Sequence, residues 1–270
     1  MSVTISASLV KELRDATGAG MMDCKRALEE TDGDLEAART LLRERGMASA
    51  GKRAGRSTTE GMVGFVVEDG VGSIVGVGCE TEPVSKSDEF QAFCIKVLRA
   101  VHADGPGAVA AFEEERVELI AKLGENIVVV GPERFEAPAG NALAGYAHPP
   151  ANKIGVLVEL EGGTREVARQ LAMHISFAAP EWATREDVPA EVVERERSIF
   201  LNSDEVQSKP EAAREKIVDG MLGKRFFAAV PGGTLVDQAW IHDPALTVGQ
   251  ALSEAGASVV RFARVSVAGS

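Results

Sequence analysis

Apolar residues near the N-terminus recur every three or four positions, which is the spacing of one helix face. In the first such run they are Leu9, Val10, Leu13 and Ala16. Ser6 or Ser8 can cap this helix, because a short hydroxyl side chain accepts a hydrogen bond from a free amide of the first turn. The glycine-containing turn Thr17–Gly20 is then expected to end it.

Two further helices are expected in the same segment. The second starts near Met22 and ends before the turn at Asp32. Asp34 is a good cap for the third helix, and Gly46 is expected to stop it. We therefore predict a three-helix N-terminal domain over residues 1–46.

The composition changes after this domain. Residues 47–60 are rich in Ala, Gly, Ser, Lys and Arg and show no clear apolar period. Such a segment is typical of a linker, because it offers no continuous apolar face that could pack against a core. We predict a linker over residues 47–60.

The middle of the chain alternates between β-rich runs and amphipathic helices. The runs 62–67 and 73–79 predict a hairpin, and a helix with acidic residues in its first turn follows Ser87. The apolar stripe of this helix is Phe90, Phe93, Cys94, Val97 and Val101. A second helix over 109–123 and a strand over 127–130 complete this part.

A similar succession follows with an offset of about eighty residues, which indicates two related subdomains. Strands are expected over 143–147 and 154–160, and Thr164 leads into a helix that Pro180 ends. Near the C-terminus, residues 258–267 alternate well enough to predict a closing strand.

Residues 183–227 have a different pattern, with two helical faces around a central break and many flanking charges. This pattern favours an inserted helical hairpin of coiled-coil or dimerisation type. The predicted fold class is therefore α+β: a three-helix unit, a linker, two α+β subdomains with antiparallel sheets, and the hairpin. The subdomains are placed at 61–140 and at 141–182 together with 228–270.

The composition narrows the class of protein. The formal net charge of −12 opposes direct nucleic-acid binding, since that binding draws its affinity from Lys and Arg at phosphates. The three cysteines, Cys24, Cys79 and Cys94, are too few and too widely spaced for a disulfide framework and suit a reducing compartment. Neither a signal peptide nor a membrane-spanning apolar run is evident, so we expect a cytoplasmic protein without membrane contact.

No residue pattern indicates a catalytic centre. The segment Gly46–Arg53 has the glycine spacing of a phosphate loop, but Arg53 stands where Ser or Thr should hold magnesium. Cys79 precedes acidic residues, which oppose thiolate formation. The histidines lack neighbours at metal-ligand spacing; they are His102, His148, His174 and His242. We expect no enzyme activity, no cofactor and no metal ion, and a protein that works by binding another protein.

Two places are more informative about binding. Met21 and Met22 follow a glycine turn at a helix start. Adjacent helical residues cannot easily both point inward, so one methionine is expected in the core and the other at an adaptable binding surface. His148 ends a strand beside Pro149-Pro150; it is more often structural in such a place, although it could face a partner.

These residues together resemble the bacterial elongation factor Ts family. The segment Ser6–Lys25 reads SASLVKELRDATGAGMMDCK and matches the opening of that family closely. Cys79–Phe93, CETEPVSKSDEFQAF, resembles its strand-to-helix segment. Shorter matches are GEN at 124–126, IGVLVEL at 154–160, AMHI at 172–175 and the KPE…KIV.G pattern at 209–220. The similarity runs in order from about residue 3 to 267.

The resemblance implies an exchange factor for the GTPase elongation factor Tu, which it would bind in the GDP-bound and nucleotide-free states. It also implies a ubiquitin-associated-like fold for the three helices, and a hairpin that can serve homodimer contacts. By the same resemblance Met21, Met22 and Asp23 contact the GTPase, and His148 lies near the interface. The magnesium-displacing loop is formed by Thr81, Glu82, Pro83 and Val84.

One departure from the family matters. The loop usually reads Thr-Asp-Phe-Val, whereas this chain has Thr81-Glu82-Pro83-Val84. Pro83 removes an aromatic wedge and a backbone N–H, and it biases Glu82 towards an extended backbone. The alternative reading is therefore a regulatory paralogue that binds the GTPase with weakened exchange activity.

Overall fold

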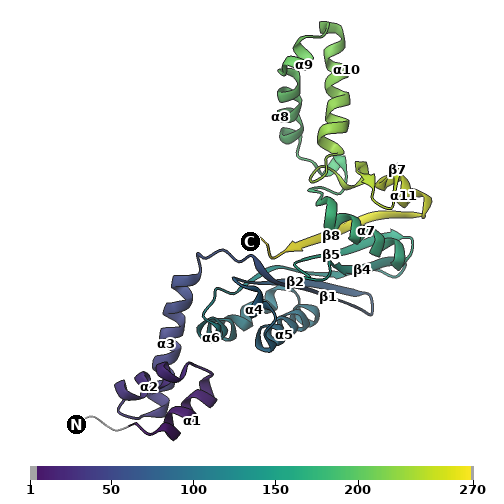
Figure 1. Ribbon diagram of the computed structural model, residues 1–270. Coiled ribbons are helices and arrows are strands. Elements are labelled where there is room, and N and C mark those ends of the chain that lie inside the picture. The colour runs from purple at the N-terminus through teal and green to yellow at the C-terminus, as the bar shows by residue number, and fades with distance from the viewer. Residues whose placement is uncertain (1–4, 269–270) are drawn as a thin grey trace. The chain divides into compact units, whose positions relative to one another are not determined.

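The computed structural model describes residues 5–268, apart from the side chain of Ser49. It is a mixture of helices and small sheets, as the predicted α+β class requires (Figure 1). The α-helices are α1 (Ala7–Thr17), α2 (Met21–Glu30), α3 (Leu35–Arg53), α4 (Glu82–Ser85), α5 (Asp88–Asp104), α6 (Glu113–Leu123), α7 (Arg165–Ala178), α8 (Ala190–Leu201), α9 (Asp204–Gln207), α10 (Glu211–Met221) and α11 (Val248–Glu254).

Over residues 5–268 the strands form sheets of the orders β1-β2-β3, β4-β5-β8 and β6-β7. Their bounds are β1 (Glu60–Glu68), β2 (Val71–Cys79), β3 (Val128–Glu136), β4 (Asn141–Ala147), β5 (Ile154–Gly162), β6 (Ala239–Trp240), β7 (Asp243–Thr247) and β8 (Ala257–Ser266). The described residues also contain short helical segments of other types: η1 (Pro106–Phe112), η2 (Arg185–Asp187), η3 (Leu222–Phe227) and η4 (Leu235–Asp237).

The first three helices begin where the sequence predicts. The side chain of Ser6 accepts a hydrogen bond from the amide of Leu9, and that of Asp34 accepts one from Ala37. Gly18 ends α1 in the left-handed conformation that glycine adopts without a Cβ penalty. The three helices enclose their own apolar cluster, which contains Val10, Leu13, Cys24, Ala27, Leu28 and Ala38.

The predicted helix stop at Gly46 is wrong. Gly46 lies inside α3, which continues to Arg53 through half of the predicted linker. Alanine, methionine, lysine and arginine are good helix formers, so this stretch is helical without a continuous apolar stripe. Gly46 also has a packing role, because a β-carbon there would stand 3.2 Å from the β-carbon of Ala121 on α6.

The predicted hairpin of β1 and β2 turns at Asp69 and Gly70, whose φ angles of 49° and 76° suit a tight two-residue turn. Ser87 caps α5, and the whole predicted stripe of this helix is buried in a cluster with Val75 and Val77 of β2. The third strand, β3, extends to Glu136, beyond the predicted end at residue 130.

A second hairpin and helix are formed by β4, β5 and α7. The two strands pair antiparallel, with Ala144 opposite Val158, and Thr164 caps α7. The apolar face of α7 joins residues of β4 and β5 in one buried cluster. The pattern along the chain did not predict β6, β7 and α11, which lie between the hairpin insert and β8.

The predicted break in the helical insert lies between α9 and α10. The insert has its own small core, which includes Val188, Val206, Val218 and Met221. Arg197 of α8 forms ion pairs with Glu215 and Asp219 of α10, which join the two long helices.

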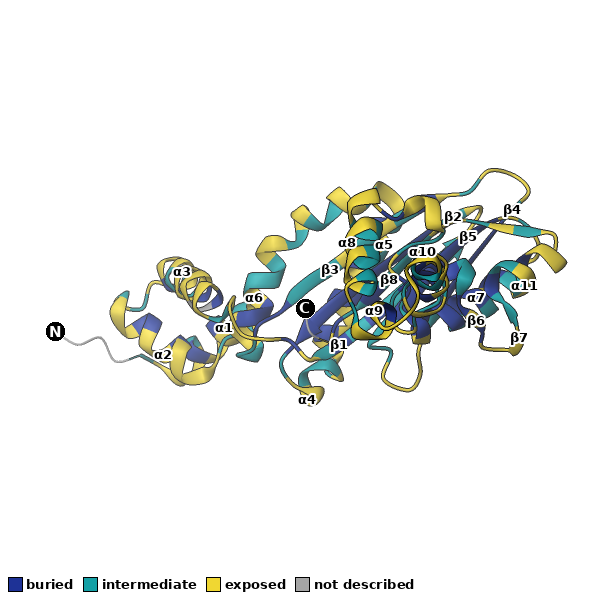
Figure 2. Cartoon of the chain, turned by 90° about the horizontal axis from the view of Figure 1, so that it is seen from above, coloured by how far each residue is buried: buried dark blue, intermediate teal, exposed yellow. Residues whose placement is uncertain are grey.

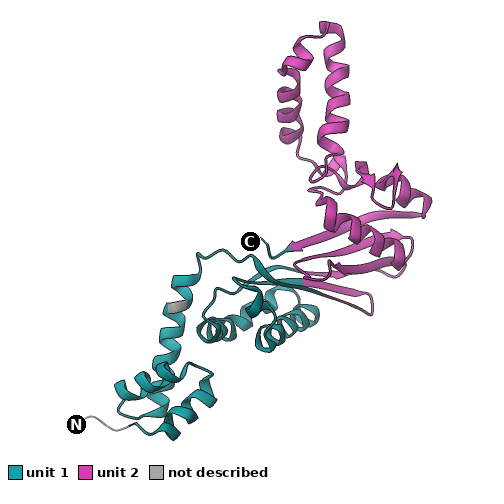
Figure 3. Ribbon diagram, in the orientation of Figure 1, with its two compact units in different colours: residues 1–64, 75–132, 266–270 teal, residues 65–74, 133–265 magenta. Residues whose placement is uncertain are grey.

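By its internal contacts the chain divides into two compact units (Figure 3). Unit 1 comprises residues 1–64, 75–132 and 266–270, and unit 2 comprises 65–74 and 133–265. Buried residues gather on the central strands of the sheets, whereas the N-terminal helices have mostly exposed surfaces (Figure 2).

Candidate functional site

The N-terminal residues that are predicted to bind a partner lie at the start of α2. Met21 and Met22 are both exposed, with 59% and 61% of their surface accessible. The expectation that one of them fills the core is wrong, because the buried face of α2 consists of Cys24, Ala27 and Leu28 and the methionines precede it. Two flexible apolar side chains therefore stand side by side at the surface, where thioethers can adapt to a partner.

Asp23 is the third residue of this group. Its carboxylate lies in the first turn of α2, where the positive end of the helix dipole favours a negative charge. The same carboxylate pairs with Arg26 on the next turn. Both side chains of the pair are more than half exposed, so the pair adds little to stability and leaves Asp23 accessible.

The loop from Thr81 to Val84 follows β2 directly. Thr81 has an extended backbone, and Glu82 opens the single turn α4. The prediction of an extended backbone at Glu82 is wrong. Pro83 is tolerated here because the first amides of a helix have no intrahelical acceptor, so the missing N–H costs no hydrogen bond. Glu82 and Pro83 are exposed, whereas Val84 packs against the buried cluster below α5.

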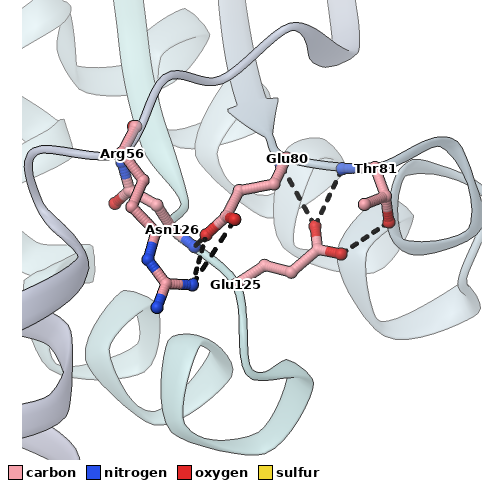
Figure 4. Close-up of polar contacts among 5 residues, drawn as sticks. All are labelled: Arg56, Glu80, Thr81, Glu125 and Asn126. Atoms are coloured by element: carbon pink, nitrogen blue, oxygen red, sulfur yellow. Dashed lines mark hydrogen bonds and ion pairs between the residues drawn. The ribbon is translucent and has the colours of Figure 1, made fainter.

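The base of this loop is held by a carboxylate that lies far away in sequence (Figure 4). One oxygen of Glu125 accepts hydrogen bonds from the amides of Glu80 and Thr81, both at 3.0 Å. Its other oxygen accepts the hydroxyl hydrogen of Thr81 at 2.5 Å. Hydrogen bonds to an ionised carboxylate are among the stronger ones in proteins.

A second hydrogen bond runs in the opposite direction, from the segment of Glu125 to the side chain of Glu80 (Figure 4). The carboxylate of Glu80 accepts the amide hydrogen of Asn126 at 2.7 Å and lies 3.4 Å from the guanidinium of Arg56. The side-chain amide of Asn126 donates to the carbonyl oxygen of Arg56 at 2.8 Å. We call these five residues (Arg56, Glu80, Thr81, Glu125 and Asn126) the loop brace.

Sequence reasoning identified Thr81 but missed its partner Glu125. The family-like GEN segment at 124–126 was the available signal, since it places an acidic residue and an amide directly after α6. The pattern of one segment cannot show which other segment it meets, because that depends on the tertiary fold.

His148 is exposed and follows β4. The phenol oxygen of Tyr146 lies 3.0 Å from Nδ1 of its ring. The backbone of His148 is fixed by two hydrogen bonds, its amide donating to Ile154 and its carbonyl accepting from Asn152. The imidazole is therefore presented at the surface from a well-defined turn. His148 belongs to unit 2, whereas Met21–Asp23 and Thr81–Val84 belong to unit 1.

The candidates for catalysis in the sequence lie in a regular helix or in the buried interior. The segment Gly46–Arg53 is part of α3 and therefore has no phosphate-loop geometry. Cys24, Cys79 and Cys94 are buried free thiols, and burial raises the pKa of Cys94 to about 12. The thiol of Cys79 lies 3.4 Å from the carbonyl oxygen of Thr81, to which it donates.

Within residues 5–268, no group of three or more His, Cys, Asp or Glu side chains is arranged to hold a metal ion. Over the same residues, every helix is too short or too polar to cross a lipid bilayer.

Comparison with known proteins gives a consistent result. The family model described as Elongation factor TS matches residues 80–269, which include the whole loop 81–84 and Glu125. The elongation factor Ts of Thioalkalivibrio sulfidiphilus is 44% identical over 277 aligned positions, which cover 98% of this chain and 92% of that protein. The proteins of the same name from Alkalilimnicola ehrlichii and Idiomarina loihiensis are 44% and 42% identical over similar lengths.

Proposed function

Since the chain belongs to the elongation factor Ts family, we propose that it promotes the release of GDP from elongation factor Tu, the GTPase of translation elongation. The observation that carries this proposal is the loop Thr81–Val84. Its tip is exposed, its base is fixed by the loop brace, and it lies within the matched family region. An exposed, pre-ordered segment is what one protein needs to disturb a binding site in another.

The proposed mechanism is thermodynamic linkage. The protein binds the nucleotide-free GTPase more tightly than the GDP-bound form, so bound GDP weakens the complex by the same free energy by which the complex weakens GDP binding. No covalent step is involved. The loop Thr81–Val84 is proposed to press on the magnesium and phosphate site of the GTPase, with Glu82 adding a negative charge near the metal ion.

Other residues are proposed to supply binding energy. Met21 and Met22 offer exposed apolar surface at the start of α2, and burying a methionine side chain in an interface contributes roughly 1.5–3 kcal/mol. Asp23 stands beside them with its carboxylate accessible. His148 offers an imidazole at the surface of unit 2. These contacts would hold the GTPase while the loop acts on its nucleotide.

Pro83 supports a second candidate function, a regulatory paralogue that binds elongation factor Tu with weakened exchange. Proline has a smaller apolar surface than the phenylalanine that the family usually has in the loop, and a buried phenyl ring contributes roughly 2 kcal/mol. Pro83 is exposed in α4, so any loss would be felt at the partner and not in the core of this chain.

The hairpin insert is proposed as a homodimer contact. Ile199 of α8 is an exposed apolar residue on a helix whose inner side is occupied by the core of the insert. Analytical ultracentrifugation tests this point: the proposal expects a dimer that Ile199→Glu dissociates, and a monomer at all concentrations would contradict it.

One experiment separates the two candidate functions. Elongation factor Tu carrying a fluorescent GDP analogue is mixed with increasing amounts of the protein in a stopped-flow instrument, with excess unlabelled GDP present. An exchange factor accelerates the loss of fluorescence to a saturating rate. A stable complex without acceleration identifies the regulatory paralogue. If the protein neither accelerates the loss of fluorescence nor forms a complex, both candidate functions are refuted.

A further inference from the structure

We infer that Glu125 is a positioning residue for nucleotide exchange, which acts through Thr81 to hold the loop Thr81–Val84 in the orientation that the GTPase meets. The inference rests on the proposed function. It adds a residue outside the loop, separated from Thr81 by 44 positions, whose side chain decides how the loop is presented.

The loop needs an external support because α4 is a single turn. A helix this short has almost no intrinsic stability, since nucleation fixes several dihedral angles for one hydrogen bond. The hydroxyl of Thr81 stands at the N-cap position but forms no cap bond to the turn. Within α4, Ser85 and Lys86 donate their amides to the carbonyls of Thr81 and Glu82. Ordering Thr81 therefore helps to order the turn, together with the packing of Val84 against the buried cluster.

Glu125 supplies that order by three hydrogen bonds to two consecutive residues. Its carboxylate fixes both amides at the end of β2 and the hydroxyl of Thr81. The hydroxyl is used for this purpose and not for capping. Glu125 is half-buried, and this excludes part of the competing water at its partly buried bond to the amide of Glu80.

The crosswise arrangement makes the brace stiff. Glu80 and Thr81 bond to the side chain of Glu125, while the amide of the next residue, Asn126, bonds to the side chain of Glu80. If one chain segment moved past the other, the hydrogen bonds to Glu125 and the hydrogen bond to Glu80 would both break. A loop with a fixed base loses less conformational freedom when the partner binds, so more of the binding energy is left to displace GDP.

The test compares Glu125→Ala with Glu125→Gln. Alanine removes all three acceptor bonds. Glutamine has the same shape, and its carbonyl can still accept both amides while its NH2 group donates to the hydroxyl of Thr81. Glu118→Ala is the matched control, because Glu118 is an exposed glutamate on α6 that receives the same substitution. If Glu125→Ala does not fold, Thr81→Val removes one bond of the brace at nearly constant shape.

We expect Glu125→Ala to lower the saturating rate of GDP release by roughly tenfold or more, with glutamine and the control within about twofold of the parent. Affinity for the nucleotide-free GTPase should fall by a smaller factor than the release rate, because only the loop loses its order and the rest of the contact surface is retained. In the free protein, amide hydrogen exchange over residues 80–86 should become faster in Glu125→Ala and Thr81→Val only.

Several results would overturn the inference. Unchanged release by Glu125→Ala would exclude a role for this residue, and a Gln variant as slow as the Ala variant would assign the effect to charge. A parallel fall in affinity and rate, with unchanged exchange over residues 80–86, would indicate a general structural role. If the parent protein does not accelerate GDP release from elongation factor Tu, the proposed function is refuted, and with it any role of Glu125 in nucleotide exchange. This holds even if amide hydrogen exchange shows a loosened loop in the Glu125→Ala variant.

Discussion

Nε2 of His174 lies 3.0 Å from the side-chain oxygen of Gln238 in the interior of unit 2. The amide nitrogen of Gln238 donates to the carbonyls of Ala229 and Gly232, so its oxygen must accept from the imidazole. Nδ1 of the ring in turn accepts the amide hydrogen of Ile241. His174 is therefore neutral, with its hydrogen on Nε2, and it has a structural role in the interior of unit 2.

This arrangement predicts a loss of stability in mild acid. Burial lowers the pKa of His174, and neighbouring His242 lowers it further, against the opposing effect of the Gln238 bond. The unfolded chain therefore binds a proton at a pH where the folded chain does not, starting near the ordinary value of about 6.5. The free energy of unfolding should be constant above that pH and fall below it, as urea titrations from pH 8 to pH 5 can measure.

A substitution tests this pH dependence. His174→Gln should flatten the slope of stability against pH below about 6.5, because glutamine does not bind a proton in this range. An unaltered slope in His174→Gln would show that carboxylates alone carry the acid sensitivity.

Pro83→Phe should accelerate GDP release. A phenyl ring at the exposed tip of α4 can enter an apolar site of the partner, and a gain of about 2 kcal/mol at the transition state corresponds to a rate increase of more than about tenfold. The saturating rate of fluorescent GDP release measures the effect.

Pro83→Ala separates the ring from the backbone. Alanine restores the N–H group of the turn without adding an apolar wedge, so it should stay within about twofold of the parent. Equal rates of GDP release for the phenylalanine variant and the parent would contradict the hypothesis that Pro83 weakens exchange. They would favour the parent as a fully active exchange factor.

Met21→Ala and Met22→Ala should weaken binding to elongation factor Tu without destabilising the protein. Each removes apolar surface that is already exposed in the free chain, so the free energy of unfolding should change by less than about 0.5 kcal/mol. Affinity should fall by roughly 5- to 30-fold for each, as titration calorimetry can measure. Met47→Ala is the matched control, since Met47 is 58% exposed on α3; an equal loss of affinity there would argue against a specific methionine contact.

Gly51→Ala should stabilise the protein, because Gly51 lies in the helical part of the predicted linker. A β-carbon at this position meets no atom within 4 Å, and alanine favours a helix by roughly 0.5–1 kcal/mol over glycine. Gly61→Ala should do the reverse, since φ there is 137° and the β-carbon would stand 2.1 Å from the carbonyl oxygen of Val77. Thermal unfolding followed by circular dichroism distinguishes them; a lower Tm for Gly51→Ala would mean that α3 ends earlier.

The sequence predicts the local features of this fold well. The predicted cap Asp34 is confirmed, and of the two serines predicted as possible caps of the first helix Ser6 is the one that caps it. Ser87 and Thr164, which were predicted to lead into helices, also cap them. The buried stripe of α5 follows equally from the helical period. These features depend on residues that are close together in the sequence, so a pattern over a few residues is enough to predict them.

The remaining features depend on contacts between distant segments. The sequence alone favours Gly46 as a helix stop, whereas in the structure Gly46 lies within α3 and packs closely against α6. Both Met21 and Met22 are exposed because the core of the three helices ends at Cys24. The bond between Thr81 and Glu125 joins residues that no periodicity relates. The candidate loop could therefore be located from the sequence, whereas the group that supports it could not.

The central claim is that this protein binds nucleotide-free elongation factor Tu and thereby weakens its hold on GDP. Titration calorimetry with nucleotide-free and GDP-loaded elongation factor Tu, together with the affinity for GDP in the presence and absence of the protein, tests it most directly. Linkage requires the two ratios of affinity to be equal and larger than one. Equal affinity for both states, or no detectable complex with the nucleotide-free GTPase, would contradict the account.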